Sequence, residues 1–148
     1  MNWKIVPYDK KDFDTCVGLF DFNSPKYFLE EERAPFLSYL RVTKWYYLVT
    51  QGALTTAAFG LQFIPNSQQH ARLHWIMVHP GMQGQGIGSF IMEWIFQRME
   101  KEGSMVLEVD TSQVSVSFFE RYNIEILETI KNGWGSGMDR INLLLYRP

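Results

Sequence analysis

A glycine-rich stretch at residues 79–89 decides the fold of this chain. It reads His79-Pro80-Gly81-Met82-Gln83-Gly84-Gln85-Gly86-Ile87-Gly88-Ser89. An apolar run over 72–78 precedes it and predicts a strand, and apolar residues at helical spacing from Ile87 to Met99 follow it and predict a helix. Glycines let the backbone approach a ligand closely. The first turn of a helix presents unpaired N–H groups and the positive end of its dipole, so this junction suits an anion such as a pyrophosphate.

Outward from this junction, the sequence alternates between strand-like and helix-like patterns. β-Branched and aromatic runs predict strands over 3–7, 45–49, 54–64, 72–78, 105–109, 124–130 and 141–146. Amphipathic runs predict helices over 12–22, 28–41, 87–102 and 115–122. The order predicts a mixed α/β (α+β) fold. We expect a largely antiparallel, twisted sheet of six to seven strands flanked by about four helices.

Two segments between these elements predict loops. Residues 65–70 are polar and include a proline, which predicts a loop between two strands. Residues 132–137 join the last two predicted strands, and the glycines within 133–140 predict a turn-rich, mobile excursion.

The composition limits the class of protein. The length of 148 residues is enough for one domain, which we expect to span 1–148. The chain has 14 basic and 16 acidic residues and a formal net charge of −2, which argues against a nucleic-acid partner. Hydrophobic residues make up 46%, which excludes global disorder, and aromatic residues make up 16%, which suits a dense core and an aromatic-lined pocket.

A single cysteine, Cys16, excludes an intramolecular disulfide framework and a cysteine-rich zinc site. No cluster of His, Cys and Asp has the spacing of metal ligands, so we expect no metal. The chain opens without a signal-peptide core and contains no apolar stretch of about 18 residues. We therefore expect a cytoplasmic protein with no membrane partner.

Two nucleotide-binding motifs do not fit the glycine-rich stretch. A Walker A loop requires a lysine before Ser89, where this chain has Gly88. A Rossmann fingerprint requires Gly-x-Gly-x-x-Gly, and the spacing of Gly84, Gly86 and Gly88 differs from it.

The stretch instead resembles the GNAT superfamily of acyl-CoA-dependent N-acetyltransferases. The family signature is Gln/Arg-x-x-Gly-x-Gly/Ala, and Gln83, Gly86 and Gly88 fill its specified positions. The likeness continues downstream, where 107–109 resembles the next strand of the family. Residues 117–124 resemble its Phe-Tyr-Glu-Lys-x-Gly-Phe helix end, and the predicted element order matches the GNAT-like acyl-CoA N-acyltransferase fold.

The resemblance implies acetyl-CoA as the cosubstrate and a set of residues that bind it. The backbone N–H groups from Gln83 through Ser89 would hold the pyrophosphate, and the main chain of Ile76, Met77 and Val78 would pair with the pantetheine arm. The Val78 N–H would stabilise the oxyanion of a tetrahedral intermediate. The full pyrophosphate set is Gln83, Gly84, Gln85, Gly86, Ile87, Gly88 and Ser89.

The same resemblance assigns Ser112 and Phe119 to the cofactor site. Ser112 lies near a position where relatives carry an asparagine, and Phe119 stands where many relatives carry a tyrosine that protonates the departing thiolate. Because Phe119 has no hydroxyl, Tyr122, about one helical turn on, is a candidate for that acid, and packing under the last strands is its alternative role.

Two residues are candidates for the general base. Glu108 occupies a strand position where some relatives place a base, and alternation puts it on one face with Val106 and Asp110. His74 would share a strand face with Ile76 and Val78, and its ordinary pKa near 6.5 suits a base. A structural role is the alternative for both residues.

In this family the final strand pair lies beside the acceptor cleft, so the resemblance makes Trp134 and Asp139 candidates for acceptor binding. A tryptophan that covers the core edge and a solvated aspartate are the alternatives.

The resemblance implies direct acetyl transfer to a primary amine of a small molecule or peptide. A non-catalytic acyl-CoA-binding or sensing module and a purely structural interaction domain are the competing hypotheses, and we leave a homodimer open.

Overall fold

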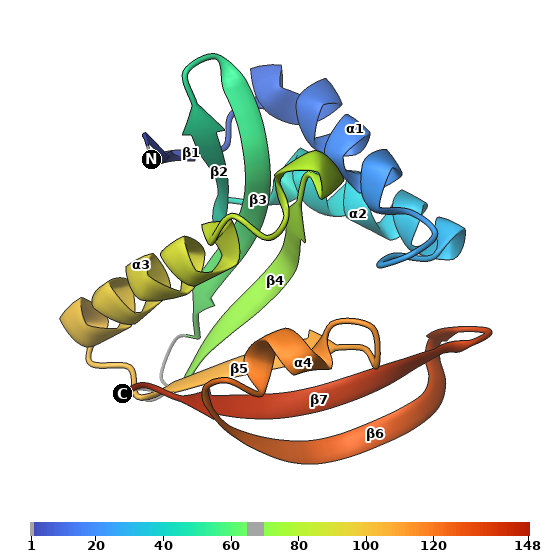
Figure 1. Ribbon diagram of the computed structural model, residues 1–148, viewed down its shortest axis with the longest axis vertical. Helices are drawn as coiled ribbons and strands as arrows, with labels where there is room; N and C mark the ends of the chain where they lie inside the picture. Colours follow the sequence, from blue (N-terminus) through green and yellow to red (C-terminus); the bar gives the residue numbers. More distant parts are fainter. Residues whose placement is uncertain (1, 65–69) are drawn as a thin grey trace. The chain divides into compact units, whose positions relative to one another are not determined.

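The computed structural model describes residues 2–64 and 70–148 (Figure 1). The strands are β1 (Lys4–Pro7), β2 (Tyr46–Gln51), β3 (Leu54–Phe63), β4 (His70–Val78), β5 (Val106–Thr111), β6 (Asn123–Gly135) and β7 (Met138–Tyr146). The α-helices are α1 (Phe13–Asn23), α2 (Arg33–Val42), α3 (Ile87–Glu102) and α4 (Val116–Phe119). Short 3₁₀ helices are η1 (Lys10–Asp12), η2 (Glu30–Glu32) and η3 (Pro80–Met82).

The strands follow the order β1-β2-β3-β4-β5-β7-β6 in one sheet. The pairs β1/β2, β2/β3, β5/β7 and β6/β7 are antiparallel, and β4/β5 is parallel. Within residues 2–64 and 70–148, this mixed, largely antiparallel sheet of seven strands with four α-helices confirms the fold class expected from the sequence. The expected loop over 65–70 lies, up to residue 69, outside the described residues.

The chain forms two compact units, and β4 and α3 each contribute to both. The first unit contains the described residues up to Leu61 together with Trp75–Phe90, and the second contains those of Gln62–His74 and Ile91–Pro148. A single domain over residues 1–148 stays a prediction.

The first unit has an aromatic-rich core. Helices α1 and α2 supply Phe20, Phe36 and Leu40, and the strands supply Tyr46 and Met77, all at most 2% exposed. Helix α2 begins later than the expected residue 28. The reason is local, because the Leu29 N–H donates a hydrogen bond of 2.8 Å to Glu32 and a 3₁₀ turn occupies Glu30–Glu32.

The second unit buries one face of its strands. Leu107 and Val109 of β5 and Leu143 and Leu145 of β7 are almost fully buried, and the side chains that alternate with them on β5 include Glu108 and Asp110. One face of these strands is therefore apolar, and the other carries the charged side chains of β5.

The last two strands differ from expectation. Only Ser136 and Gly137 lie between β6 and β7, so the prediction of a loop over 132–137 was wrong (Figure 1). Asn132 has a φ of 56°, its N–H donates to the Asp139 carboxylate at 3.0 Å, and its side chain accepts from the Gly137 N–H at 2.8 Å. A shift in register between Ile130 and Gly135 absorbs the extra residues, so the glycines serve a bulged hairpin.

Candidate active site

The end of β4 directs main-chain groups away from β3. The His79 N–H donates a hydrogen bond of 2.8 Å to the carbonyl of Thr56 on β3. Main-chain groups of successive strand residues point to opposite sides, so the N–H and C=O of Val78 point away from β3. The parallel pairing of β4 with β5 runs from His70↔Val106 to Leu73↔Val109 and, within the described residues, no further.

Gln83 ties the glycine-rich loop to β4. Its side-chain nitrogen donates to the Val78 carbonyl at 3.3 Å, and its side-chain oxygen accepts from the Tyr27 hydroxyl at 3.0 Å. Of the predicted site residues, Gln83 and Val78 are thus in direct contact. The Gln83 carboxamide is engaged within the protein, and its main-chain N–H donates to the Pro80 carbonyl at 3.4 Å, so binding of an anion by this N–H would require it to share or release that bond.

The loop after η3 is open to solvent at the start of α3. Residues 83–86 are exposed, and Gly84 and Gly86 have φ values of 79° and 92° that favour glycine. A Cβ at Gly84 would meet nothing within 4 Å, and one at Gly86 would meet only Trp3, at 4.0 Å. The glycines therefore leave free space above the backbone.

The first turn of α3 supplies the donors. The first intrahelical bond runs from the Phe90 N–H to the Gly86 carbonyl at 3.0 Å, so the N–H groups of Ile87 and Gly88 precede the ladder, and Ser89 lies exposed in the same turn. The Ile87 side chain is buried, which limits its contribution to its N–H. An exposed backbone with open space and a helix N-terminus fits a diphosphate group.

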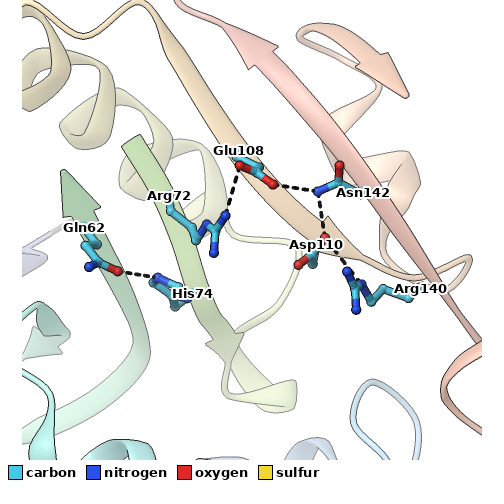
Figure 2. A network of polar contacts seen from close by, with 7 residues as sticks. All are labelled: Gln62, Arg72, His74, Glu108, Asp110, Arg140 and Asn142. Carbon is cyan, nitrogen blue, oxygen red and sulfur yellow. Dashed lines mark hydrogen bonds and ion pairs between the residues drawn. The ribbon is translucent and has the colours of Figure 1, made fainter. Parts of the chain in front are cut away.

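A polar network joins side chains of β4, β5 and β7 in the second unit (Figure 2). One carboxylate oxygen of Glu108 accepts from Arg72 at 3.1 Å, and the other accepts from the Asn142 amide at 3.0 Å. The Asn142 amide also donates to Asp110 at 2.8 Å, and Arg140 lies 3.7 Å from Asp110. Burial by itself would raise the pKa of Glu108, but the hydrogen bonds from Asn142 and Arg72 and the Arg72 charge together lower it.

His74 lies on β4 beside this network. Its Nε2 is 3.1 Å from the side-chain oxygen of Gln62, as Figure 2 shows. Burial, followed by the charge of Arg72, lowers the pKa of His74 below its ordinary value. Trp75 has a φ of 46°, which interrupts the alternation from which a shared face with Ile76 and Val78 was inferred.

The α4 region contains the remaining cofactor candidates. Phe119 is buried, and its ring lies 5.0 Å from that of Phe118. Ser112 is also buried, and its hydroxyl accepts from the Val114 N–H at 3.2 Å, which caps the turn before α4. The Tyr122 ring makes edge contacts with Phe96 at 5.7 Å and Phe118 at 6.0 Å.

The two acceptor candidates are fixed by hydrogen bonds near the end of β5. The Trp134 indole N–H donates to the Thr111 carbonyl at 2.9 Å. The Asp139 carboxylate accepts from Asn132, and its backbone N–H donates to the side chain of Gln113 at 2.9 Å. Asp139 therefore has a structural role in the hairpin, and Trp134 is anchored to β5.

Sequence reasoning missed the partners of Glu108. Alternation along β5 identified Asp110 as a neighbour, but Arg72, Arg140 and Asn142 come from β4 and β7. Arg72 faces Glu108 directly in the strand register, and Asn142 faces Asp110. The sequence does show a basic residue in the β4 segment and an amide residue in the β7 segment, which could pair with the acidic residues of β5. Which residues pair depends on the register between strands, and a single strand does not reveal that register.

In residues 2–64 and 70–148, no group of three or more His, Cys, Asp or Glu side chains is placed to hold a metal ion. No helix in the same ranges is long and apolar enough to cross a membrane.

Comparison with solved structures shows the same fold. A GNAT-family protein of Desulfovibrio desulfuricans is 17% identical with a TM-score of 0.81, covering 99% of this chain and 100% of its own. The ribosomal-protein-S18-alanine N-acetyltransferase of Escherichia coli is 18% identical with a TM-score of 0.79, covering 99% and 94%. An aminoglycoside 6'-N-acetyltransferase complexed with coenzyme A is 12% identical with a TM-score of 0.74, covering 98% and 97%.

Comparison by sequence gives the family. No curated protein matches the chain. The family model described as "Acetyltransferase (GNAT) family" matches residues 7–123, which is more than half of the chain. With the glycine-rich loop between β4 and α3 and the sheet order described above, this match shows that the chain belongs to the GNAT acetyltransferase family.

Proposed function

We propose that this protein is an N-acetyltransferase that moves the acetyl group of acetyl-CoA directly to a primary amine. The observation that carries the proposal is the exposed loop at the N-terminus of α3, where Gly84 and Gly86 leave the backbone uncovered. Membership of the GNAT family supports it. The coenzyme A complex of a structural neighbour supports the choice of cosubstrate.

The proposed cofactor site consists of main-chain groups. The N–H groups of residues 83–89 would bind the pyrophosphate, aided by the positive end of the α3 dipole. Ile76, Met77 and Val78 would pair with the pantetheine arm, in the part of β4 beyond its pairing with β5. Because these contacts are backbone contacts, they place few demands on side-chain identity.

The chemistry requires a stabilised oxyanion. Acetyl-CoA would supply a thioester that the amine attacks directly, through a tetrahedral intermediate. The Val78 N–H would donate to the oxygen that becomes negative, and its direction away from β3 supports this role. The Gln83 side chain holds the Val78 carbonyl and so restrains the next peptide.

Glu108 is our candidate for the general base, acting directly or through a water. Its lowered pKa keeps the carboxylate ionised at neutral pH, which a proton acceptor requires, although it also makes the carboxylate a weaker base. His74 stays the second candidate. Its lowered pKa keeps the imidazole neutral, and the hydrogen bond to Gln62 engages one ring nitrogen.

Tyr122 is the proposed acid for the departing thiolate, since Phe119 has no hydroxyl. Ser112 and Phe119 would border the cofactor through packing, because both are buried and the Ser112 hydroxyl caps a turn.

The acceptor is proposed to be a primary amine of a small molecule or a peptide. The names of two structural neighbours include a ribosomal-protein alanine and an aminoglycoside, and both fall in these classes. Trp134 would form part of the acceptor surface with its half-exposed ring, and Asp139 would shape that surface through the hairpin. A cytoplasmic location, the absence of a nucleic-acid partner and the homodimer stay predictions.

The direct test is acetyl-CoA consumption across a panel of amines, followed by release of free thiol. We expect turnover with at least one amine and binding of coenzyme A in a titration without any amine. Absence of binding by any acyl-CoA would contradict the proposal.

A second candidate function is a non-catalytic acyl-CoA-binding or sensing domain. Phe119 favours it, because the position at which many relatives carry an acidic hydroxyl is filled by a buried hydrocarbon ring. Binding of acetyl-CoA with no thiol release for any amine would select this candidate.

A further inference from the structure

Trp75 has an unusual backbone conformation in the middle of β4. Its φ is 46°, in the left-handed region where the Cβ of an ordinary residue crowds the following carbonyl. Among the described residues, the other non-glycine with positive φ is Asn132, a residue type that tolerates this region. A bulky residue keeps such a conformation only where its surroundings fix it, and these positions gather at functional sites.

Two kinds of contact fix Trp75 in the first unit. The indole packs in an aromatic cluster, with ring centroids 5.1 Å from Phe36, 5.8 Å from Phe28 and 6.5 Å from both Phe20 and Tyr39. The Trp75 carbonyl accepts a hydrogen bond of 2.7 Å from the hydroxyl of Tyr46 on β2. This side-chain donor satisfies the Trp75 carbonyl at the point where the backbone departs from strand geometry.

The Tyr46 hydroxyl is well suited to remain a donor. The side chain is 2% exposed, and its ring contacts Tyr8, Phe36 and Tyr39 at 5.5–6.0 Å. Burial, followed by the nearby Cys16, Tyr39 and Tyr8, raises the pKa of Tyr46 well above its ordinary value. The hydroxyl therefore keeps its proton at every pH at which the protein would act.

The bond from Tyr46 sets the direction of the following main-chain groups. The Trp75 carbonyl and the Ile76 N–H belong to one planar peptide, so fixing the carbonyl fixes the N–H. From Ile76 the chain continues as a strand to Val78, and the bond from the His79 N–H to Thr56 fixes the far end. The segment 76–78 is thus held at one end by a side chain of β2 and at the other by the main chain of β3.

We propose that Tyr46 is a positioning residue for acyl transfer. Its hydroxyl holds the Trp75–Ile76 peptide so that the main-chain groups of Ile76 and Val78 are aligned for the thioester. This inference rests on the proposed function, because it concerns the segment assigned there to the pantetheine arm and the oxyanion. Tyr46 itself touches no reacting atom.

The test compares Tyr46→Phe with Tyr39→Phe. Both variants remove one hydroxyl from the same aromatic cluster. Tyr46→Phe removes the hydroxyl that donates to the Trp75 carbonyl, and Tyr39→Phe leaves that hydroxyl in place. In the ligand-free protein, amide dipolar couplings of Ile76 and Val78 should change in Tyr46→Phe and stay unchanged in Tyr39→Phe. With an accepted amine, kcat should fall about five- to tenfold in Tyr46→Phe only, while CoA affinity changes less than about twofold.

Three outcomes would overturn the inference. The first is that the amide dipolar couplings of Ile76 and Val78 are the same in the wild type and in Tyr46→Phe. The second is that kcat falls equally in Tyr46→Phe and in Tyr39→Phe. If Tyr46→Phe does not fold, the wild type decides, since couplings that fit a regular strand through Trp75 would also overturn it. A wild type without turnover for any amine would instead contradict the proposed enzyme, and the couplings would still test the role of Tyr46 in holding the peptide.

Discussion

Arg72 and Glu108 face each other directly in the parallel pairing of β4 and β5, and the Arg72 guanidinium lies 3.1 Å from the Glu108 carboxylate. The pair is part of the polar network of the second unit, in which Asn142 binds the other oxygen of Glu108. These donors stabilise the ionised form of Glu108 and outweigh the effect of burial on its pKa. The proposed base is therefore controlled by residues that sequence reasoning did not identify.

Arg72→Met should move the acidic limb of the kcat/KM profile to higher pH. The substitution removes a hydrogen bond and a positive charge that lower the pKa of Glu108, so protonation would inactivate the base at a higher pH. Arg140→Met is the matched control, because Arg140 lies near Asp110 rather than Glu108. If the acidic limb moves equally in both variants, or in neither, Arg72 does not specifically lower the pKa of the general base.

Glu108→Gln should lower kcat by about 100-fold or more, the usual contribution of a positioned base. The amide keeps the size of the side chain, so the affinity for CoA in a titration should stay nearly unchanged. Measuring kcat and CoA affinity on the same preparation separates catalysis from binding. A variant with wild-type kcat would transfer the role of base to His74 or to solvent.

His74→Gln should make the free energy of unfolding less sensitive to acid. The folded state lowers the pKa of His74 from its ordinary 6.5, so between the two pKa values the unfolded state binds more protons. Stability is then lost as the pH falls through about 6.5, and the loss is absent above that pH. Urea unfolding of both proteins at pH 7.5 and at pH 5.5 measures the difference. Equal losses in the two proteins would contradict the burial of a neutral imidazole.

Trp134→Phe should destabilise the fold by about 1 kcal/mol, because it removes the hydrogen bond of 2.9 Å that the indole N–H donates to the Thr111 carbonyl. If Trp134 also forms part of the acceptor surface, KM for the amine should rise while KM for acetyl-CoA stays constant. Steady-state kinetics with each substrate varied in turn distinguishes the two effects. An unchanged amine KM would leave Trp134 a purely structural residue.

The element order of the fold was predictable from local patterns. The helical spacing from Ile87 to Met99 and the glycine-rich stretch before it located α3, whose first residue is Ile87 and which ends before Gly103 as expected. Helix and strand periods are local properties, so one sequence is enough to reveal them. The glycines of 132–137 misled the reading of the final hairpin, because a positive φ and a bulge use the same residues as a loop.

The main-chain part of the candidate site could be proposed from the sequence. The side-chain contacts between strands could not, because they depend on the order and register of the strands. Gln83, Gly84 and Gly86 could be proposed as candidates because they lie within four residues of one another in the sequence. The contacts of Tyr46 with Trp75 and of Arg72 with Glu108 span 29 and 36 residues, and they depend on how the strands are ordered in the sheet. Nor does any pattern reveal that Trp75 adopts a positive φ, since this conformation is imposed by packing around it.

The account depends most directly on the backbone at the start of α3, and a titration with coenzyme A of two matched variants tests it. Gly86→Glu and Gly103→Glu introduce the same charge at glycines with φ values of 92° and 70°, the first before α3 and the second after it. We predict that Gly86→Glu weakens CoA binding by about 100-fold or more, equivalent to about 2.7 kcal/mol, while folded Gly103→Glu binds as the wild type does. Wild-type affinity in a folded Gly86→Glu protein would contradict the proposed diphosphate site.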